Sequence, residues 1–277
     1  MLIIGIIAGA LLIWLLYGYL SNYHLVTTTF TVPVDESVDG HTFVHLSDLH
    51  CCRFGKDNQR LLAAVESARP EAVFITGDMV TKNMSTGNKK VQRVLLFLET
   101  LCKKYPVYYA DGNHEIRLKD YAGYREELSR IGVRLAVDGV FDFPVGGINL
   151  YALELPITWF RTKNEMKLAD IKAYIDKEKS KDEAMSILLA HDPGYFETYA
   201  EWGADLSLSG HLHGGILRLP VIGGVFSPYL RLFPRYDAGM YEKDGRRMIV
   251  SRGLGTHHVK LRWFNPPEMI IIKLRSK

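Results

Sequence analysis

Apolar runs in this chain end repeatedly in side chains that bind metal ions, and this recurrence constrains the fold more than any other feature. The stretch Val44–His50 reads V-H-L-S-D-L-H, so the apolar run stops at Ser47 and a carboxylate and an imidazole follow. Four later runs end similarly, and the five endings together hold Asp48, His50, Asp78, Asn113, His114, His191, His211 and His213. One such ending would be interpreted as a turn or a helix cap. Because strands of one sheet bring their ends together, five endings predict a metal site at a sheet edge.

These side chains suit divalent first-row metal ions. Carboxylate oxygen and imidazole nitrogen accept Mn, Fe or Zn, and the sequence does not choose among the three. The set exceeds what one zinc-like ion needs, so we expect two ions that share a bridging carboxylate. Two ions ~3.5–4 Å apart hold the attacking and leaving oxygens and lower the pKa of bound water, as in phosphoryl transfer to water. His114 directly follows Asn113, and we expect a general acid or a hydrogen-bond donor to phosphate there, not a ligand.

The N-terminal stretch Leu2–Leu20 predicts a membrane anchor. It contains no charged residue, and about 19 residues at ~1.5 Å each span roughly the ~30 Å hydrocarbon core. A cleaved signal peptide is the alternative, but no Lys or Arg precedes the run and no small-x-small site follows it. We therefore expect a single-pass anchor over residues 1–22. The side of the membrane is not specified, because the nearest basic residue after the anchor is Arg53. Interfacial aromatics gather at one end of the stretch: Trp14, Tyr17, Tyr19 and Tyr23.

After the anchor, apolar runs alternate with helical spacing, and no internal repeat is visible. This pattern predicts one domain over residues 28–277. Tyr23–Asp39 is expected to be an extended edge strand or a linker, and short strands are expected near Leu135 and Val140. The predicted core strands are His41–Ser47, Ala72–Thr76, Val107–Ala110, Ile148–Leu153, Met185–Ala190, Leu206–Ser209, Met248–Val250 and Met269–Leu274. The predicted helices are Asp57–Arg69, Lys89–Lys104, Tyr121–Ile131 and Asn164–Glu178.

Net charge and cysteine content restrict the possible binding partners and the cellular compartment. A net charge of +3 is too small to indicate a nucleic-acid partner, and no long basic run is present. The odd number of cysteines excludes a disulfide framework and favours a reducing compartment. Cys51 and Cys52 lie beside the predicted site, where we expect them to pack as small apolar residues and not to bind metal.

The motifs D-x-H, G-D, G-N-H-E, a lone His after a strand and G-H-x-H resemble those of the calcineurin-like metallophosphoesterases, in the same order. The resemblance covers nearly everything after the anchor. It extends to G-K-D-N, G-G-x-x-R-L-P and V-S-R-G-L-G, which are similar to the membrane-associated or secreted bacterial branch. It implies an α/β (α+β) fold of two face-to-face mixed β-sheets flanked by helices, with the site across their upper edge.

The resemblance also implies a role for each residue of the site. The first ion would be held by Asp48, His50 and His213, and the second by Asn113, His191 and His211. Asp78 would bridge the two ions, and His114 would lie over the phosphate. The chain departs from the branch at Ile216, where Gln is frequent, and at the Cys51-Cys52 pair; these departures bear on the substrate pocket and on metal preference or redox sensitivity.

The substrate is predicted less directly, because one metal site serves many phosphate esters. The apolar segment Ile216–Tyr236 carries Arg218, Arg231 and Arg235, and the segment Trp159–Arg161 repeats this combination. Arginine suits phosphate and the apolar residues suit acyl chains or a membrane surface, although both segments could simply pack over the sheet edge. We expect a phosphodiester or pyrophosphate substrate in or near the membrane. The alternatives are a lipid-precursor pyrophosphatase similar to UDP-diacylglucosamine hydrolases, and an inactive, metal-stabilised scaffold.

Overall fold

A six-stranded mixed sheet forms one half of the domain. The computed structural model describes residues 1–161, 166–175, 184–215, 217–219, 221–226, 232–256 and 260–276. In sheet order the strands are β1 (Val26–Val34), β13 (Glu268–Ser276), β2 (Thr42–Leu46), β3 (Ala72–Ile75), β4 (Val107–Tyr109) and β5 (Arg134–Leu135). β1 runs parallel to β13, β13 runs antiparallel to β2, and β2 to β5 are parallel. The predicted edge strand within Tyr23–Asp39 is therefore β1.

A five-stranded sheet forms the other half. Its order is β11 (Gly239–Lys243), β12 (Arg246–Val250), β8 (Leu206–Ser209), β7 (Met185–Ala190) and β6 (Ile148–Leu153). The strands are parallel except for the β11–β12 hairpin. The two sheets share one buried apolar cluster, in which Phe43, Phe74 and Ile270 of the first meet Leu150 and Ile187 of the second. The sheets therefore pack face to face.

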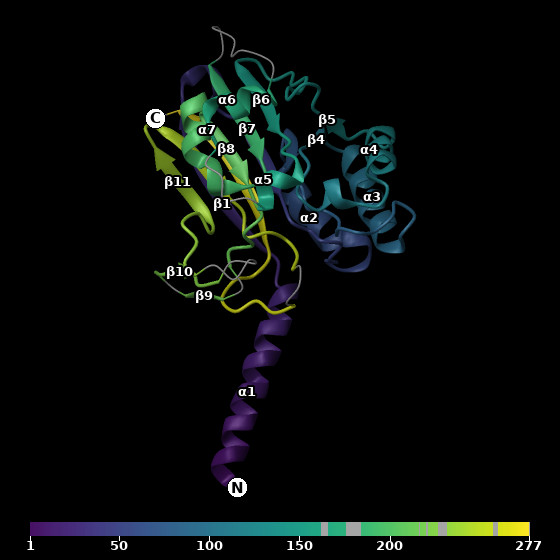
Figure 1. Ribbon diagram of the computed structural model, residues 1–277, viewed down its shortest axis with the longest axis vertical. Helices are drawn as coiled ribbons and strands as arrows, with labels where there is room; N and C mark the ends of the chain where they lie inside the picture. Colours follow the sequence, from purple (N-terminus) through teal and green to yellow (C-terminus); the bar gives the residue numbers. More distant parts are fainter. Residues whose placement is uncertain are drawn as a thin grey trace.

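Helices cover the outer face of each sheet, which completes four layers (Figure 1). α2 (Gln59–Ala68), α3 (Lys89–Cys102) and α4 (Tyr121–Arg130) bury their apolar faces against the first sheet. α6 (Leu168–Lys172) and α7 (Phe196–Trp202) pack against the second, near the short helix α5 (Ile157–Arg161). With both faces of each sheet covered, the inner strands β2, β3, β4, β7 and β8 are buried along nearly their whole length, whereas the edge strands β1 and β11 contain exposed residues. The predicted two-sheet fold is confirmed.

The register brings the ligand-bearing strand ends to the side of the domain from which the N-terminal helix leaves. Val26 pairs with Glu268 at the start of β1, and Ile270 pairs with His45 near the end of β2. The carboxyl end of β2 thus lies beside the beginning of β1, shortly after α1 (Leu2–Leu20) ends. Because β3 and β4 are parallel to β2, their carboxyl ends point the same way.

The helix α1 projects away from the domain (Figure 1). By length and composition it is apolar and long enough to cross a membrane, with a mean hydropathy of 2.2 and only 6% of its most apolar window buried. A signal sequence would have the same properties. The predicted boundaries, residues 1–22 for the anchor and 28–277 for the domain, stay a prediction.

One predicted helix is shorter than expected within the described residues, and several elements are not predicted from the sequence. Within the described residues of the expected helix Asn164–Glu178, only Leu168–Lys172 is α-helical. The carbonyl oxygen of Met166 instead accepts a bond from Thr198 of α7, and Lys167 is extended, so tertiary contacts override the helical spacing. The expected strand at Val140 is an isolated bridge. The unpredicted elements are α5, α7, β11 and the small hairpin of β9 (Arg218–Leu219) and β10 (Gly223–Gly224).

We predict that Gly77→Ala lowers the free energy of unfolding by at least about 2 kcal/mol. Gly77 has a φ of +78°, and a Cβ there would collide with the backbone of Gly112 where β3 and β4 end. The measurement is chemical or thermal unfolding of purified protein. Gly87→Ala is the matched control, because a Cβ there meets nothing within 4 Å, and its effect should stay within about 0.5 kcal/mol. Equal stability of the two variants would contradict the close approach.

Candidate metal centre

The residues that the sequence singles out meet at one edge of the two sheets. The first sheet contributes three polar segments, which follow β2, β3 and β4, and the second sheet contributes the segments after β7 and β8. All of the predicted side chains are buried, none more than 8% exposed: Asp48, His50, Asp78, Asn113, His114, His191, His211 and His213. Burial of so many ionisable groups without a compensating cation would be expensive. The arrangement therefore suits bound metal ions.

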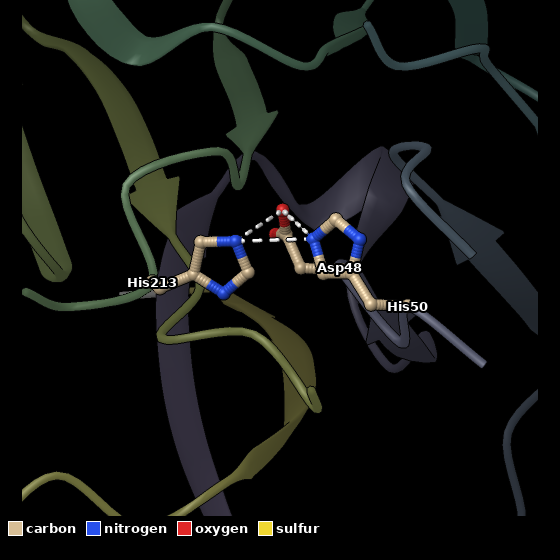
Figure 2. A group of neighbouring side chains, drawn as sticks. All are labelled: Asp48, His50 and His213. Atoms are coloured by element: carbon tan, nitrogen blue, oxygen red, sulfur yellow. Dashed lines mark hydrogen bonds and ion pairs between the residues drawn. The ribbon is translucent and has the colours of Figure 1, made fainter. Parts of the chain in front are cut away.

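One group of three side chains has the form of a cation site. The Nε2 atoms of His50 and His213 lie 3.1 Å apart. Asp48 Oδ1 lies 3.5 Å from His213 Nε2 and 3.9 Å from His50 Nε2. Figure 2 shows the two rings turned toward each other with the carboxylate between them. All three ligand atoms can reach one ion.

A second group lies next to the first. His191 Nε2 is 3.3 Å from Asp78 Oδ2 and 3.2 Å from His211 Nδ1. Asp78 Oδ2 is also 3.7 Å from His50 Nε2 in the first group. One carboxylate thus reaches both groups, which is the position that a bridging ligand requires.

Asn113 supplies the clearest sign that a cation is needed. Its Oδ1 atom is buried and has no hydrogen-bond partner among the described residues. An unsatisfied buried acceptor costs about 1–3 kcal/mol, so such atoms are normally paired. The next residue, His114, donates its backbone N–H to Asp78 Oδ1 at 2.8 Å, so Asn113 lies beside the carboxylate that reaches both groups, where a metal ion would satisfy its oxygen. The donor set therefore fits the two ions expected from the sequence.

The backbone around these ligands is held in an unfavourable conformation. Positive φ angles, between 47° and 71°, occur at Asp48, His50, Asp78, His211 and His213. Non-glycine residues adopt this region at a cost of about 1–3 kcal/mol each, and such residues gather at functional sites. Neighbouring hydrogen bonds hold the conformation, as when Asp48 N donates to Gly77 O and His50 N donates to Asp78 O.

Hydrogen bonds at the far side of two rings fix which nitrogen faces the site. His213 Nδ1 bonds to the carbonyl oxygen of Gly255 at 3.0 Å, and His191 Nδ1 bonds to that of Thr76 at 2.5 Å. Since only a protonated nitrogen can donate to a carbonyl, the Nε2 atoms are left to bind metal. Burial lowers the pKa of His213 to about 3, so its ring is neutral at pH 7.

His114 is oriented as a donor toward the same site. Its Nδ1 accepts a hydrogen bond from Lys82 N at 3.0 Å, so in the neutral ring the proton is on Nε2. That Nε2 lies 3.9 Å from Asp78 Oδ2, beside both ligand groups. Burial lowers the pKa of His114 to about 4, which keeps the ring neutral at pH 7.

Glu115, the last residue of the G-N-H-E motif, supports the site, although no role for it is predicted from the sequence. Its buried carboxylate accepts bonds from the backbone N–H groups of Asp78 and Met79, both at 2.8 Å, and of Gly112 at 3.0 Å. The Tyr109 hydroxyl donates to it at 2.8 Å. Glu115 therefore ties the segment after β3 to the segment after β4. The sequence does contain one sign of this role, because Glu115 directly follows the predicted site residues Asn113 and His114.

An aromatic ring closes one side of the centre. Phe160 in α5 lies with its ring 5.9 Å from that of His191 and 5.4 Å from that of His211, centroid to centroid. The segment Trp159–Arg161, noted for its composition, thus lies at the site. The cysteines do not join it, because Cys51 and Cys52 belong to none of the ligand groups found in the described part of the chain.

The arginines predicted to bind substrate differ in where they lie, and one of them is outside the described residues. Arg218 donates to Asp237 at 2.7 Å and to the carbonyl oxygen of Gly214 at 3.3 Å, one residue from a ligand. Arg235 pairs with Glu197 and is 75% exposed. Arg231 and Ile216 lie outside the described residues. Of the two described arginines, Arg218 is the one that the structure brings to the rim of the site.

Comparison with known proteins agrees with this geometry. The family model for calcineurin-like phosphoesterase matches residues 41–215. The uncharacterized metallophosphoesterase YkuE of Bacillus subtilis is 27% identical, over 97% of this chain and 93% of its own length. The phosphodiesterase YaeI of Escherichia coli is 28% identical, over 83% and 80%. The UDP-2,3-diacylglucosamine pyrophosphatase LpxG of Chlamydia muridarum is 23% identical, over 97% and 95%. Since the matched residues make up well over half of the chain and include every predicted ligand, this protein belongs to the calcineurin-like phosphoesterase family.

Proposed function

We propose that this protein is a phosphoesterase with two metal ions that hydrolyses a phosphodiester or a related phosphate ester at a membrane. The observation that carries the proposal is Asp78, whose single carboxylate reaches both groups of ligands. Asp48, His50 and His213 would hold one ion. The other would be held by Asn113, His191 and His211. Two bound divalent ions would supply Lewis acidity and a water molecule of lowered pKa.

The residues of the chain then position the ester. A phosphoryl oxygen entering the centre meets His114 Nε2–H, which the bond from Lys82 to Nδ1 aims inward. Because His114 is neutral at pH 7, its ring donates a hydrogen bond to that oxygen more readily than it gives up a proton. Phe160 excludes water from the side of His191 and His211. Arg218 lies next to the site and is the arginine best placed to contact an anionic substrate.

The substrate class follows from the position of the site and from the relatives. YaeI is named a phosphodiesterase and LpxG a pyrophosphatase, and both reactions attack a phosphorus atom with one leaving group. α1 would hold this chain in a membrane as a single-pass anchor. A phosphodiester near the bilayer is therefore our first proposal. The lipid-precursor pyrophosphatase is the second, favoured by the ligand-bearing sheet edge on the side of α1.

We predict that Asp78→Asn removes metal from the protein. The amide is uncharged and a weaker bridge, so metal content should fall from two ions per chain to one or fewer. Inductively coupled plasma mass spectrometry on the purified variant measures this content. Asp138→Asn makes the same change at an exposed residue and should retain both ions. Two ions in Asp78→Asn would refute the bridging role.

We predict that His114→Ala keeps both ions but lowers kcat by about 10²–10⁴-fold. The assay is hydrolysis of bis-p-nitrophenyl phosphate during titration with Mn²⁺, with metal content measured alongside. The leaving group distinguishes the two possible roles of His114. If His114 donates a hydrogen bond to the phosphate, kcat should fall equally for good and poor leaving groups and recover in part in His114→Gln. If His114 is a general acid, the fall in kcat should disappear with p-nitrophenolate, which leaves without a proton.

The same assay separates an enzyme from a scaffold. If the wild-type protein binds two ions and hydrolyses neither a diester nor a pyrophosphate, the proposed function is wrong and the scaffold interpretation replaces it. Turnover that requires both ions and His114 would exclude the scaffold.

A further inference from the structure

α1 packs directly against the domain through side-chain and backbone contacts. It is not joined to the domain by a flexible linker alone. Trp263 Nε1 donates to the carbonyl oxygen of Trp14 at 2.9 Å, and the two indole rings stack with centroids 5.4 Å apart. Arg262 N donates to Gly18 O, and Asn22 Nδ2 donates to Lys260 O, both at 2.9 Å. Gly18 allows this approach, because a Cβ there would lie 2.7 Å from the Trp263 ring.

This contact fixes the depth of the segment 260–265 relative to the apolar helix. Trp14 precedes the end of α1 at Leu20 by about one and a half turns, or ~9 Å along the axis. Trp263 therefore lies beside the last turns of the span. Phe264, 47% exposed, packs against the ring of Tyr17 at 5.6 Å. If α1 crosses a bilayer, these aromatic rings lie at the depth where Trp and Tyr are enriched, between the headgroups and the acyl chains.

The hairpin of β9 and β10 extends the same surface. Arg218 N donates to Trp263 O at 3.0 Å, so the hairpin is bonded to the segment that contacts α1. At its turn Val221 is fully exposed and Ile222 is 60% exposed. Leu232 and Phe233, 60% and 59% exposed, lie beside the hairpin, where Phe233 N donates to Val225 O. Figure 1 shows the hairpin next to the point where α1 leaves the domain.

The segment that contacts α1 also supports the metal ligands. Asn265 Nδ2 donates to the carbonyl oxygen of His213 at 2.7 Å. Arg262 is 1% exposed, and its guanidinium donates to Gly253 O at 3.1 Å and to Gly255 O at 2.5 Å. Gly255 O is the acceptor for His213 Nδ1. A ligand of the first ion is thus joined to α1 through two buried side chains, so the site has a fixed orientation toward the helix.

We infer that the apolar residues around the base of α1 form an interfacial surface that seats the domain in the headgroup layer of a bilayer, with the metal site opening toward that layer. The interfacial surface consists of the exposed residues Val221, Ile222, Leu232, Phe233 and Phe264, together with the half-buried Trp263. The inference rests on the proposal that α1 spans a membrane, and it deepens the proposed function by placing the substrate phosphate among lipid headgroups. Its occupant is lipid because the surface continues directly from the lipid-facing end of α1.

The experiment measures whether the hairpin touches acyl chains in the full-length protein. Ile222→Trp and, separately, Phe233→Trp are reconstituted into phosphatidylcholine vesicles with or without bromines on the upper acyl carbons. Bromine quenches indole emission by contact. The emission added by the new Trp, obtained by subtraction of the wild-type spectrum, should be blue-shifted and mostly lost in brominated vesicles. Ser37→Trp is the control, because this exposed residue lies at the opposite end of the first sheet, between β1 and β2, and its added emission should not be quenched.

The outcomes separate this inference from the proposed function. If Trp14 and Trp263 are quenched but both hairpin indoles emit unquenched, α1 spans the bilayer and the interfacial surface is refuted. If no indole is quenched, both the anchor and the inference fail, although activity on bis-p-nitrophenyl phosphate can persist. If the emission of the hairpin indoles is blue-shifted but equally intense in both vesicle types, and the protein crosslinks as a dimer, a second copy of the chain covers the surface and lipid does not.

Discussion

The site depends on the close meeting of two strand ends, where Asp78 follows β3 and Asn113 follows β4. Gly77 and Gly112 leave room for the two backbones to touch, and Glu115 bonds to both segments from behind. These contacts hold Asp78 in a left-handed conformation that points its carboxylate at His50 and His191 together. Without this approach, the Asp78 carboxylate would not be held where it reaches both groups. The position of the Asp78 carboxylate between the two groups is therefore a consequence of how the two strand ends pack.

The strands and the predicted ligands could be found from the sequence because both signals are local. A strand buried on both faces is an apolar run, and a polar ligand must interrupt it where the strand ends. Met185–Ala190 and Leu206–Ser209 have the boundaries that this pattern predicts. Positions such as Glu115, Asn265 and Arg262 could not be found in this way. These residues act through contacts with residues distant in the chain, and such contacts leave no periodic pattern in the sequence.

Long-range contacts also explain the errors in secondary structure. The helical spacing within Asn164–Glu178 is real, but Met166 bonds to Thr198, and the described helix is limited to Leu168–Lys172. Conversely, α7 was missed although its apolar residues Phe196, Tyr199 and Trp202 have helical spacing. α7 has only seven residues, too few for this spacing to distinguish a helix from a loop. Propensity predicts an element well only where tertiary packing agrees with it.

Arg262 shows how the two ends of the chain are coupled. A buried guanidinium is normally paired with a carboxylate, because desolvation of an unpaired charge is expensive. Burial lowers the pKa of Arg262 to about 10, yet the group is still charged at pH 7. Its guanidinium donates to the carbonyl oxygens of Arg252, Gly253, Gly255 and Asn265, which supply negative partial charge and belong to the loop under His213. The same residue donates its backbone N–H to Gly18 in α1. These bonds connect the loop, the predicted ligand His213 and α1, as the proposed orientation of the site toward a membrane requires.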